Sequence, residues 1–276
     1  MNFHTDEWIM ERVREHYIDA LEYFPEDRIV GIFNQGSANY HLDVPTSDCD
    51  TKLIVTPTFK EIAMNYKPVS TTHIRANDEH TDWKDIRLYF NCFKKANLNF
   101  MEILWTPYTI INPLYEEQWN RLIENREAIA RYAPRQAIKS MQGIAHEKYF
   151  AMEHHYPSRM EWINKYQMDP KQLHHLLRVE EYLMRYIAGE LYGDCLVSKQ
   201  SEFLKEIKLG KLNGKDIDLE NARVMAKNAI DNIDKTCKEC LETIDNTVDK
   251  KVEQLLDDVQ YEIMRIAIEK EIEKEA

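Results

Sequence analysis

Apolar and polar residues follow two different patterns along this chain, and the change between them divides it. Up to residue 111, short apolar runs rich in β-branched and aromatic residues alternate with polar turns and with segments of helical spacing. From residue 112 onward, helical spacing continues with few interruptions. We therefore expect an α/β domain with a mixed sheet at 1–111, followed by an all-helical domain at 112–276. The first domain should contain strands at 28–33, 48–55, 69–74 and 100–105, and helices at 6–24, 58–65 and 82–96.

Start and stop residues place the helices of the second part. Asp169 is a suitable N-cap, Pro170 suits the first helical position, and Gln172 follows three residues after the cap. The predicted helices lie at 113–132, 134–155, 170–191 and 203–209, and two long charged ones follow at 216–243 and 246–274. We expect these last two to pack as an antiparallel pair on the helical domain. A dimerisation coiled coil is the alternative, which would make the chain a homo-oligomer.

The segment between the first two predicted strands carries the candidate chemistry. Gly36 permits a sharp turn and Ser37 offers a hydroxyl and a free backbone N–H. Asp48 and Asp50 are two residues apart, so on a strand both carboxylates point to the same face. Neighbouring carboxylates repel each other unless a cation lies between them, and Mg²⁺ prefers such oxygen ligands. The alternative is a plain tight turn, with Ser37 capping a short helix and two solvated aspartates.

This arrangement resembles the nucleotidyltransferase superfamily typified by DNA polymerase β. The residues that carry the resemblance are Gly36-Ser37, a ten-residue spacer and Asp48-Cys49-Asp50, and the surrounding sequence is most similar to the bacterial and phage branch of predicted nucleotidyltransferases. The resemblance implies transfer of a nucleoside monophosphate from a nucleoside triphosphate to a hydroxyl, with release of pyrophosphate. It also implies two Mg²⁺ ions at Asp48, Asp50 and a third acid, with Gly36 and Ser37 binding phosphates.

Glu102 is the candidate for the third acid. It stands alone in the apolar run Phe100-Met101-Glu102-Ile103-Leu104-Trp105, where an unpaired carboxylate is costly unless it binds a metal or a partner. The resemblance places its third acid on a later strand, and an Asn shortly before Glu-apolar-Leu is typical of the branch. Asp82 and Asp85 are rivals, but both lie at the start of a predicted helix, where Asp is favoured for capping.

The predicted helix at 170–191 offers cations for a triphosphate. Lys171, His174 or His175, and Arg178 have spacings that share one helix face. Helical domains of the resembled superfamily often supply such a face, so we assign Lys171, His174 and Arg178 to nucleotide binding. The alternative is an ordinary solvated face of a bundle helix.

Composition limits the partners. The 276 residues carry a net charge of −12, which disfavours extended binding to duplex nucleic acid but allows a small anionic substrate. We expect no membrane span and no export signal, and therefore a cytoplasmic protein whose five cysteines are reduced. The acceptor stays open between a protein side chain, a small molecule, an RNA 3′ end and a second nucleotide. A non-catalytic nucleotide-sensing or protein-binding member of the same fold is the alternative function.

Overall fold

The computed structural model describes residues 2–275, and its centre is one mixed sheet of five strands in the order β3-β4-β2-β1-β5. Strand β1 (Ile29–Gln35) pairs antiparallel with β2 (Asp50–Val55) and with β5 (Thr109–Ile111). Strand β4 (His80–Asp85) runs parallel to β2 and antiparallel to β3 (Ser70–Ile74). The predicted fold class, a mixed sheet followed by a largely helical region, is confirmed.

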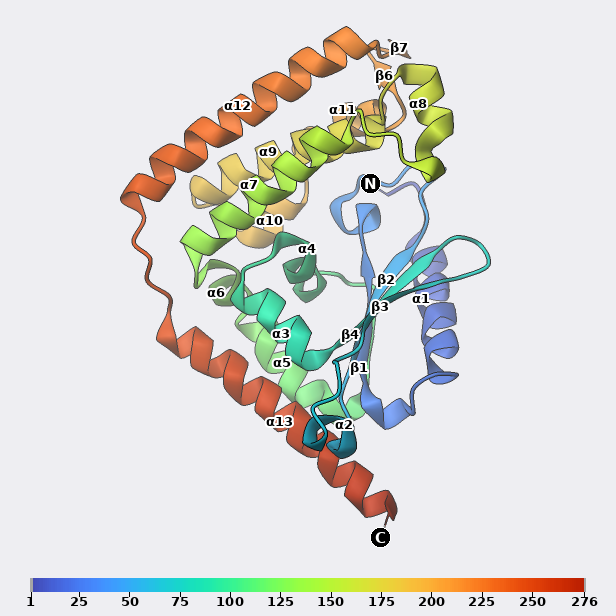
Figure 1. Cartoon of the computed structure of the whole chain (residues 1–276), viewed down its shortest axis with the longest axis vertical. Coiled ribbons are helices and arrows are strands. Elements are labelled where there is room, and N and C mark those ends of the chain that lie inside the picture. The colour runs from blue at the N-terminus through green and yellow to red at the C-terminus, as the bar shows by residue number, and fades with distance from the viewer. Residues whose placement is uncertain (1, 276) are drawn as a thin grey trace.

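The two faces of the sheet belong to different layers. Helix α1 (Asp6–Leu21) covers one face, where Ile9 and Val13 pack with Leu53 of β2. Its N-cap is Thr5, whose side chain accepts a hydrogen bond from the backbone of Trp8. The later helices lie over the other face, as Figure 1 shows. Ile54 of β2 packs into the main core on this face, because side chains alternate along a strand.

The predicted helix at 82–96 begins too early. Residues 80–85 form β4, in which buried positions alternate with half-buried ones, and only Ile86–Lys94 is helical as α3. Asp85 caps this helix, its side chain accepting a 2.8 Å hydrogen bond from the backbone of Arg87. Burial of every second side chain against the core outweighs the local helix signal. The predicted short helix at 58–65 is confirmed as α2 (Phe59–Ala63), with a capping box at its start.

The predicted strand at 100–105 is wrong, because this segment is helical. It forms α4 (Leu98–Met101) followed by a 3₁₀ turn, η3 (Glu102–Leu104). Asn97 caps the segment by accepting a 3.1 Å hydrogen bond from the backbone of Asn99. Met101, Ile103 and Leu104 are all buried, so the apolar run reflects burial rather than strand periodicity.

Residues 113–275 are mostly helical and contain one small hairpin. Asp169 caps α9 as predicted, accepting from the backbone of Lys171 at 3.0 Å. The predicted helix at 113–132 divides at Asn125. The elements are η4 (Pro113–Tyr115), α5 (Glu116–Glu124), α6 (Arg126–Arg131), α7 (Pro134–Ala151), η5 (Pro157–Arg159), α8 (Met160–Tyr166), α9 (Pro170–Ile187), α10 (Tyr192–Leu196), α11 (Ser201–Lys208) and the small hairpin β6 (Lys211–Leu212) and β7 (Lys215–Asp216). Two further 3₁₀ turns, η1 (Glu26–Arg28) and η2 (Ser37–Tyr40), flank β1.

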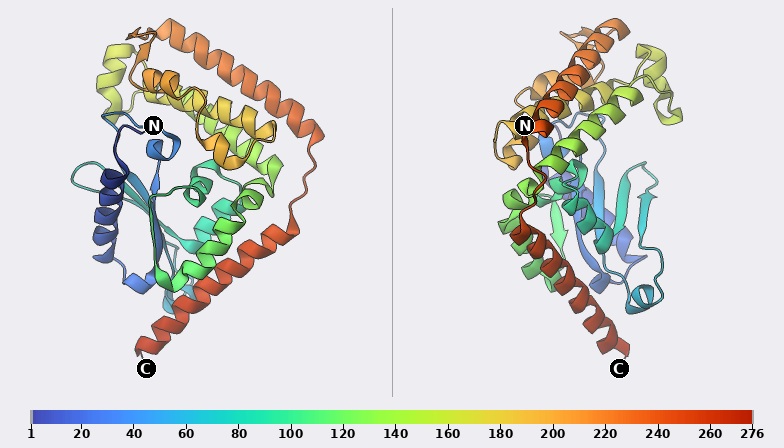
Figure 2. Two further views of the ribbon diagram at one scale, coloured as in Figure 1. Left: turned by 180° about the vertical axis from the view of Figure 1, so that it is seen from behind. Right: turned by 60° about the vertical axis from the view of Figure 1, so that its left-hand side comes forward.

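The two last helices do not form the expected antiparallel pair. Helix α12 (Leu219–Thr243) packs on α7 and α9, whereas α13 (Lys250–Glu275) packs on α3 and α5. Both views of Figure 2 show an extended segment that joins the end of α12 to the start of α13, so the two helices do not lie side by side. An ion pair between Arg121 of α5 and Glu262 of α13 holds this second helix. The division into domains at 111/112 stays a prediction, and none of the helices in residues 2–275 is both long and apolar enough to cross a bilayer.

Candidate functional site

A cavity of about 470 Å³ lies where the sheet meets the helical region. Its floor comes from the ends of β1, β2 and β4, and its walls come from α7, α8, α9 and α11. This size is within the range of small-molecule sites in proteins. The cavity brings together residues that are up to about 170 positions apart, from Gln35 to Lys208.

Most of the residues that the sequence singled out line this one cavity. They are Gly36, Ser37, Asp48, Asp50, Glu102, Lys171 and Arg178. His174 does not belong with them, since its Nδ1 lies 2.8 Å from the carbonyl oxygen of Leu204. Burial lowers the pKa of His174 to about 3, so the ring is neutral. Its neighbour His175 lines the cavity instead.

The Gly-Ser turn is built as expected and has a second serine beside it. Gly36 has φ +90°, which suits glycine, and Ser37 opens the 3₁₀ turn η2. The hydroxyl of Ser37 lies 3.4 Å from that of Ser47, which accepts a 2.8 Å hydrogen bond from Nζ of Lys208. Two hydroxyls and one ammonium therefore gather at the turn, which is a suitable donor set for phosphate oxygens.

Asp48 and Asp50 both line the cavity, but only Asp50 lies on the strand. Asp48 precedes β2 and is exposed, which corrects its expected place in the strand. The carboxylate of Asp50 accepts a 2.9 Å hydrogen bond from the backbone N–H of His80. Burial, and then the charge of Asp48, raise the pKa of Asp50. The repulsion between the two carboxylates is therefore present in the folded protein.

Asp82, considered only as a rival, also lies on the floor of the cavity. It stands opposite Lys52 in the parallel register of β2 and β4, so both residues lie on the face that carries Asp50. One of its carboxylate oxygens accepts a 2.7 Å hydrogen bond from Thr72. Its place in the site depends on the parallel pairing of β4 with β2 as well as on β4 being a strand.

Glu102 is buried beside Lys52, although not on a strand. Its Oε1 lies 3.4 Å from the backbone nitrogen of Gly36, which donates to it, and 3.9 Å from Nζ of Lys52. Its Oε2 has no hydrogen-bond partner among residues 2–275. Burial raises the pKa of Glu102 to about 8 and lowers that of Lys52 to about 8. Within residues 2–275, no three His, Cys, Asp or Glu side chains are gathered closely enough to hold a metal by themselves.

Cations dominate the helical wall. The guanidinium of Arg178 lies 3.4 Å from the centre of the Tyr40 ring, and its Nε has no hydrogen-bond partner in the described part of the chain. Burial lowers the pKa of Lys208 to about 8, and nearby Lys171 adds to this shift. Lys148 and Arg159 also face the cavity. The sequence named His175 only as the alternative to His174, and it gave no prediction for Lys52, Lys148, Arg159 and Lys208. Of these four, Lys52 had a signal, being two positions after Asp50 on the same strand.

Comparison with known proteins gives little beyond this geometry. No family model matches the chain, and no curated protein matches it. Among solved structures it is similar to a nucleotidyltransferase-like protein from Exiguobacterium sibiricum 255-15, with 11% sequence identity and a TM-score of 0.31. The match covers 84% of this chain and 75% of that chain. The class named for that protein is the one that the Gly36-Ser37 and Asp48-Cys49-Asp50 motif resembles, but at this score the likeness supports no assignment of function.

Proposed function

We propose that this chain is a metal-dependent nucleotidyltransferase of the DNA polymerase β-like superfamily. It would move a nucleoside monophosphate from a nucleoside triphosphate to an acceptor hydroxyl and release pyrophosphate. One observation carries the proposal: the Gly36-Ser37 turn and the Asp48 and Asp50 carboxylates line one cavity with a cationic wall. In a chain of net charge −12, such a wall is a specific feature that suits a small polyanion.

The chemistry of the donor set fits Mg²⁺. Asp48 and Asp50 offer hard oxygen ligands at the N-terminal end of β2. Burial, and then the charge of Asp48, raise the pKa of Asp50, so a bound cation would stabilise the ionised pair. Two bound Mg²⁺ ions would lower the pKa of the acceptor hydroxyl and neutralise charge on the triphosphate. We place the third carboxylate at Asp82, which shares the face of Asp50 on the neighbouring strand. Glu102 is the alternative, but its Oε1 is already held by Gly36.

The remaining residues divide by function. Ser37, Lys171, Arg178 and Lys208 would hold the phosphates, since hydroxyls and cations are their natural partners. Glu102 lines the cavity, and its pKa of about 8 makes its ionised form abundant only towards pH 8; in that form it would accept the proton of the acceptor hydroxyl. His175 lines the cavity in place of His174, but burial lowers the pKa of His175 well below its ordinary value, so it would contribute a neutral ring rather than a cation.

A second candidate function is metal-independent nucleotide sensing. The observation in its favour is that the described residues form no ready-made group of three metal ligands. Isothermal titration of each nucleoside triphosphate, with Mg²⁺ and with EDTA, separates the two functions. An enzyme should bind more tightly with Mg²⁺ and release pyrophosphate on addition of acceptor. Equal binding in EDTA without turnover would favour the sensor.

A further inference from the structure

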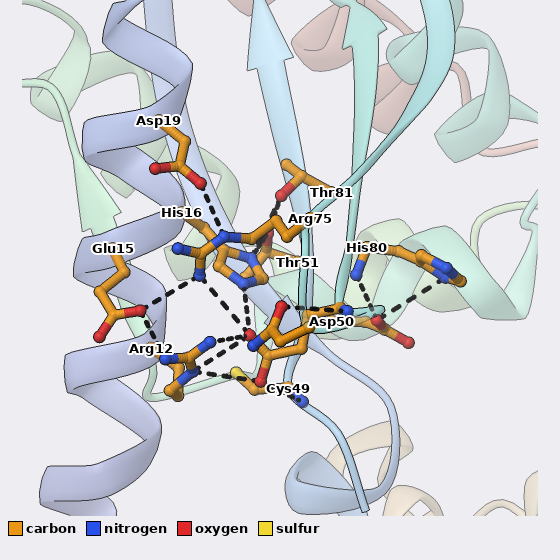
Figure 3. A network of polar contacts seen from close by, with 12 residues as sticks. Arg12, Glu15, His16, Asp19, Cys49, Asp50, Thr51, Arg75, His80 and Thr81 are labelled. Atoms are coloured by element: carbon orange, nitrogen blue, oxygen red, sulfur yellow. Dashed lines mark hydrogen bonds and ion pairs between the residues drawn. The ribbon is translucent and has the colours of Figure 1, made fainter.

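A second polar cluster lies behind the acidic strand, on the face of the sheet that α1 covers (Figure 3). Its centre is Glu79, whose side chain is only 6% exposed. Nε of Arg12 lies 3.1 Å from each carboxylate oxygen of Glu79, Nε2 of His16 lies 3.0 Å from one, and Nη1 of Arg75 lies 3.6 Å from the same one. Burial alone would raise the pKa of Glu79, but hydrogen bonds from His16 and Arg12 outweigh it and hold that pKa well below its usual value.

The cluster holds the chain on both sides of Asp50. Glu79 accepts from the backbone nitrogen of Cys49 at 3.4 Å, and Nδ1 of His16 lies 2.8 Å from the hydroxyl of Thr51. Cys49 and Thr51 point toward α1 because side chains alternate along the strand, so Asp50 points the other way, to the cavity. The orientation of Asp50 is therefore set by Cys49 and Thr51, which the cluster holds on the opposite face of the sheet.

The same cluster fixes the residues around His80. Glu79 precedes His80, and Thr81 follows it; the Thr81 hydroxyl accepts from Thr51 at 3.1 Å and lies 3.2 Å from Nδ1 of His16. The backbone N–H of His80 is the donor to the Asp50 carboxylate. The residues on either side of Asp50 and of His80 therefore contact this cluster, as Figure 3 shows.

We infer that Glu79 is a positioning residue for Asp50, and that Arg12 and His16 act through it. The inference rests on the proposed function, because it gives Asp50 a metal to hold. Residues that orient metal ligands without touching the metal change metal affinity or activity by about 10–100-fold when they are altered. A merely structural Glu79 would change thermal stability and leave the metal site unaltered.

The test compares Glu79→Gln with Glu15→Gln. Both changes remove one negative charge from the same cluster, but Glu15 is 39% exposed and contacts Arg12 and Arg75 rather than β2. Mn²⁺ binding is measured by electron paramagnetic resonance at a temperature where circular dichroism shows every variant folded. We expect Glu79→Gln to bind Mn²⁺ about 10–100-fold more weakly than wild type and Glu15→Gln to bind within about twofold of it. Triphosphate KM should change little in either, while kcat falls only in Glu79→Gln.

Arg12→Lys is the second variant, for use if Glu79→Gln does not fold. It keeps the positive charge but loses the planar fork that holds both oxygens of Glu79, so it should weaken Mn²⁺ binding in the same direction. Folded Glu79→Gln or Arg12→Lys with wild-type Mn²⁺ affinity would overturn the inference. If wild type binds Mn²⁺ but releases no pyrophosphate, the proposed transfer fails while the Mn²⁺ comparison still decides the role of Glu79. If wild type binds no Mn²⁺, both fail.

Discussion

The backbone N–H of His80 donates a 2.9 Å hydrogen bond to Oδ1 of Asp50, across the parallel pair of β4 and β2. Strand β4 therefore orients the carboxylate that β2 presents to the cavity. This one bond does not compensate for burial and for the charge of Asp48, since the pKa of Asp50 remains raised. The ionised form of Asp50 therefore lowers the stability of the folded protein unless a cation is bound beside it.

Asp50→Asn should abolish activity without harming the fold. The change removes a charge that the folded protein holds at a cost, so the free energy of unfolding in EDTA should stay equal or increase. Pyrophosphate release should fall on the order of 100-fold or more, because metal stabilisation of charge is lost. Urea unfolding and a pyrophosphate assay measure the two effects. Asp245→Asn, at an exposed position, is the matched control, and near wild-type turnover in Asp50→Asn would contradict the proposed mechanism.

Asp82→Asn and Glu102→Gln should separate the two candidates for the third carboxylate. If Asp82 is the ligand, Asp82→Asn raises the Mg²⁺ concentration needed for half-maximal activity by about 10-fold or more, since one of few charged ligands is lost. Glu102→Gln should leave that concentration almost unchanged while lowering kcat. Mg²⁺ titrations of activity give both numbers. The reverse outcome would return the third position to Glu102.

Stability should fall as the pH rises from about 5 to 8, and Glu102 is the reason. Its pKa is about 8 in the folded protein against an ordinary value of 4.5, so over this interval the folded state keeps a proton that the unfolded state has released. The stabilisation is complete below the ordinary value and is lost as the pH approaches 8. Glu102→Gln has no proton to lose, so its free energy of unfolding should depend less on pH across this window. Urea unfolding at several pH values tests this, and parallel curves for both proteins would refute the role of Glu102.

Ser37→Ala should weaken triphosphate binding more than it slows the bound substrate. The Ser37 hydroxyl donates to the Ser47 hydroxyl at 3.4 Å, a long hydrogen bond that it can exchange for one to a phosphate. Loss of one such hydrogen bond costs about 1 kcal/mol, which raises KM roughly fivefold with kcat little changed. Ser70→Ala, on the exposed edge strand β3, controls for a general effect of losing a hydroxyl. An unchanged KM would make Ser37 a turn residue only.

The sequence predicted strands β1, β2 and β3, the Gly-Ser turn and several residues of the cavity because these depend on local patterns, but it missed strands β4 and β5. Strand periodicity around Asp50, the left-handed turn at Gly36 and the Asp169 cap are each set within a few residues. The apolar run at 100–105 was misassigned because a short buried helix and a buried strand have the same composition. Asn97, which caps that helix, was the available local signal.

The remaining site residues depend on long-range packing. Asp82 enters the site only because β4 pairs in parallel with β2, which no local pattern specifies. Lys208 comes from α11, and its ammonium reaches the loop at Ser47 across the interface between the sheet and the helices. The paths of α12 and α13 were wrong for the same reason, since both carry apolar stripes and the stripe does not identify its partner.

The central claim is tested most directly by following the α-phosphate. Wild-type protein is incubated with Mg²⁺, cell extract and each nucleoside triphosphate, labelled with ³²P at either the α or the γ position. The account predicts that label from the α position enters an acceptor, whereas label from the γ position leaves in pyrophosphate. It also predicts that Asp48→Asn and Asp50→Asn transfer no label. Transfer of γ label, or transfer of α label that persists in both variants, would contradict it.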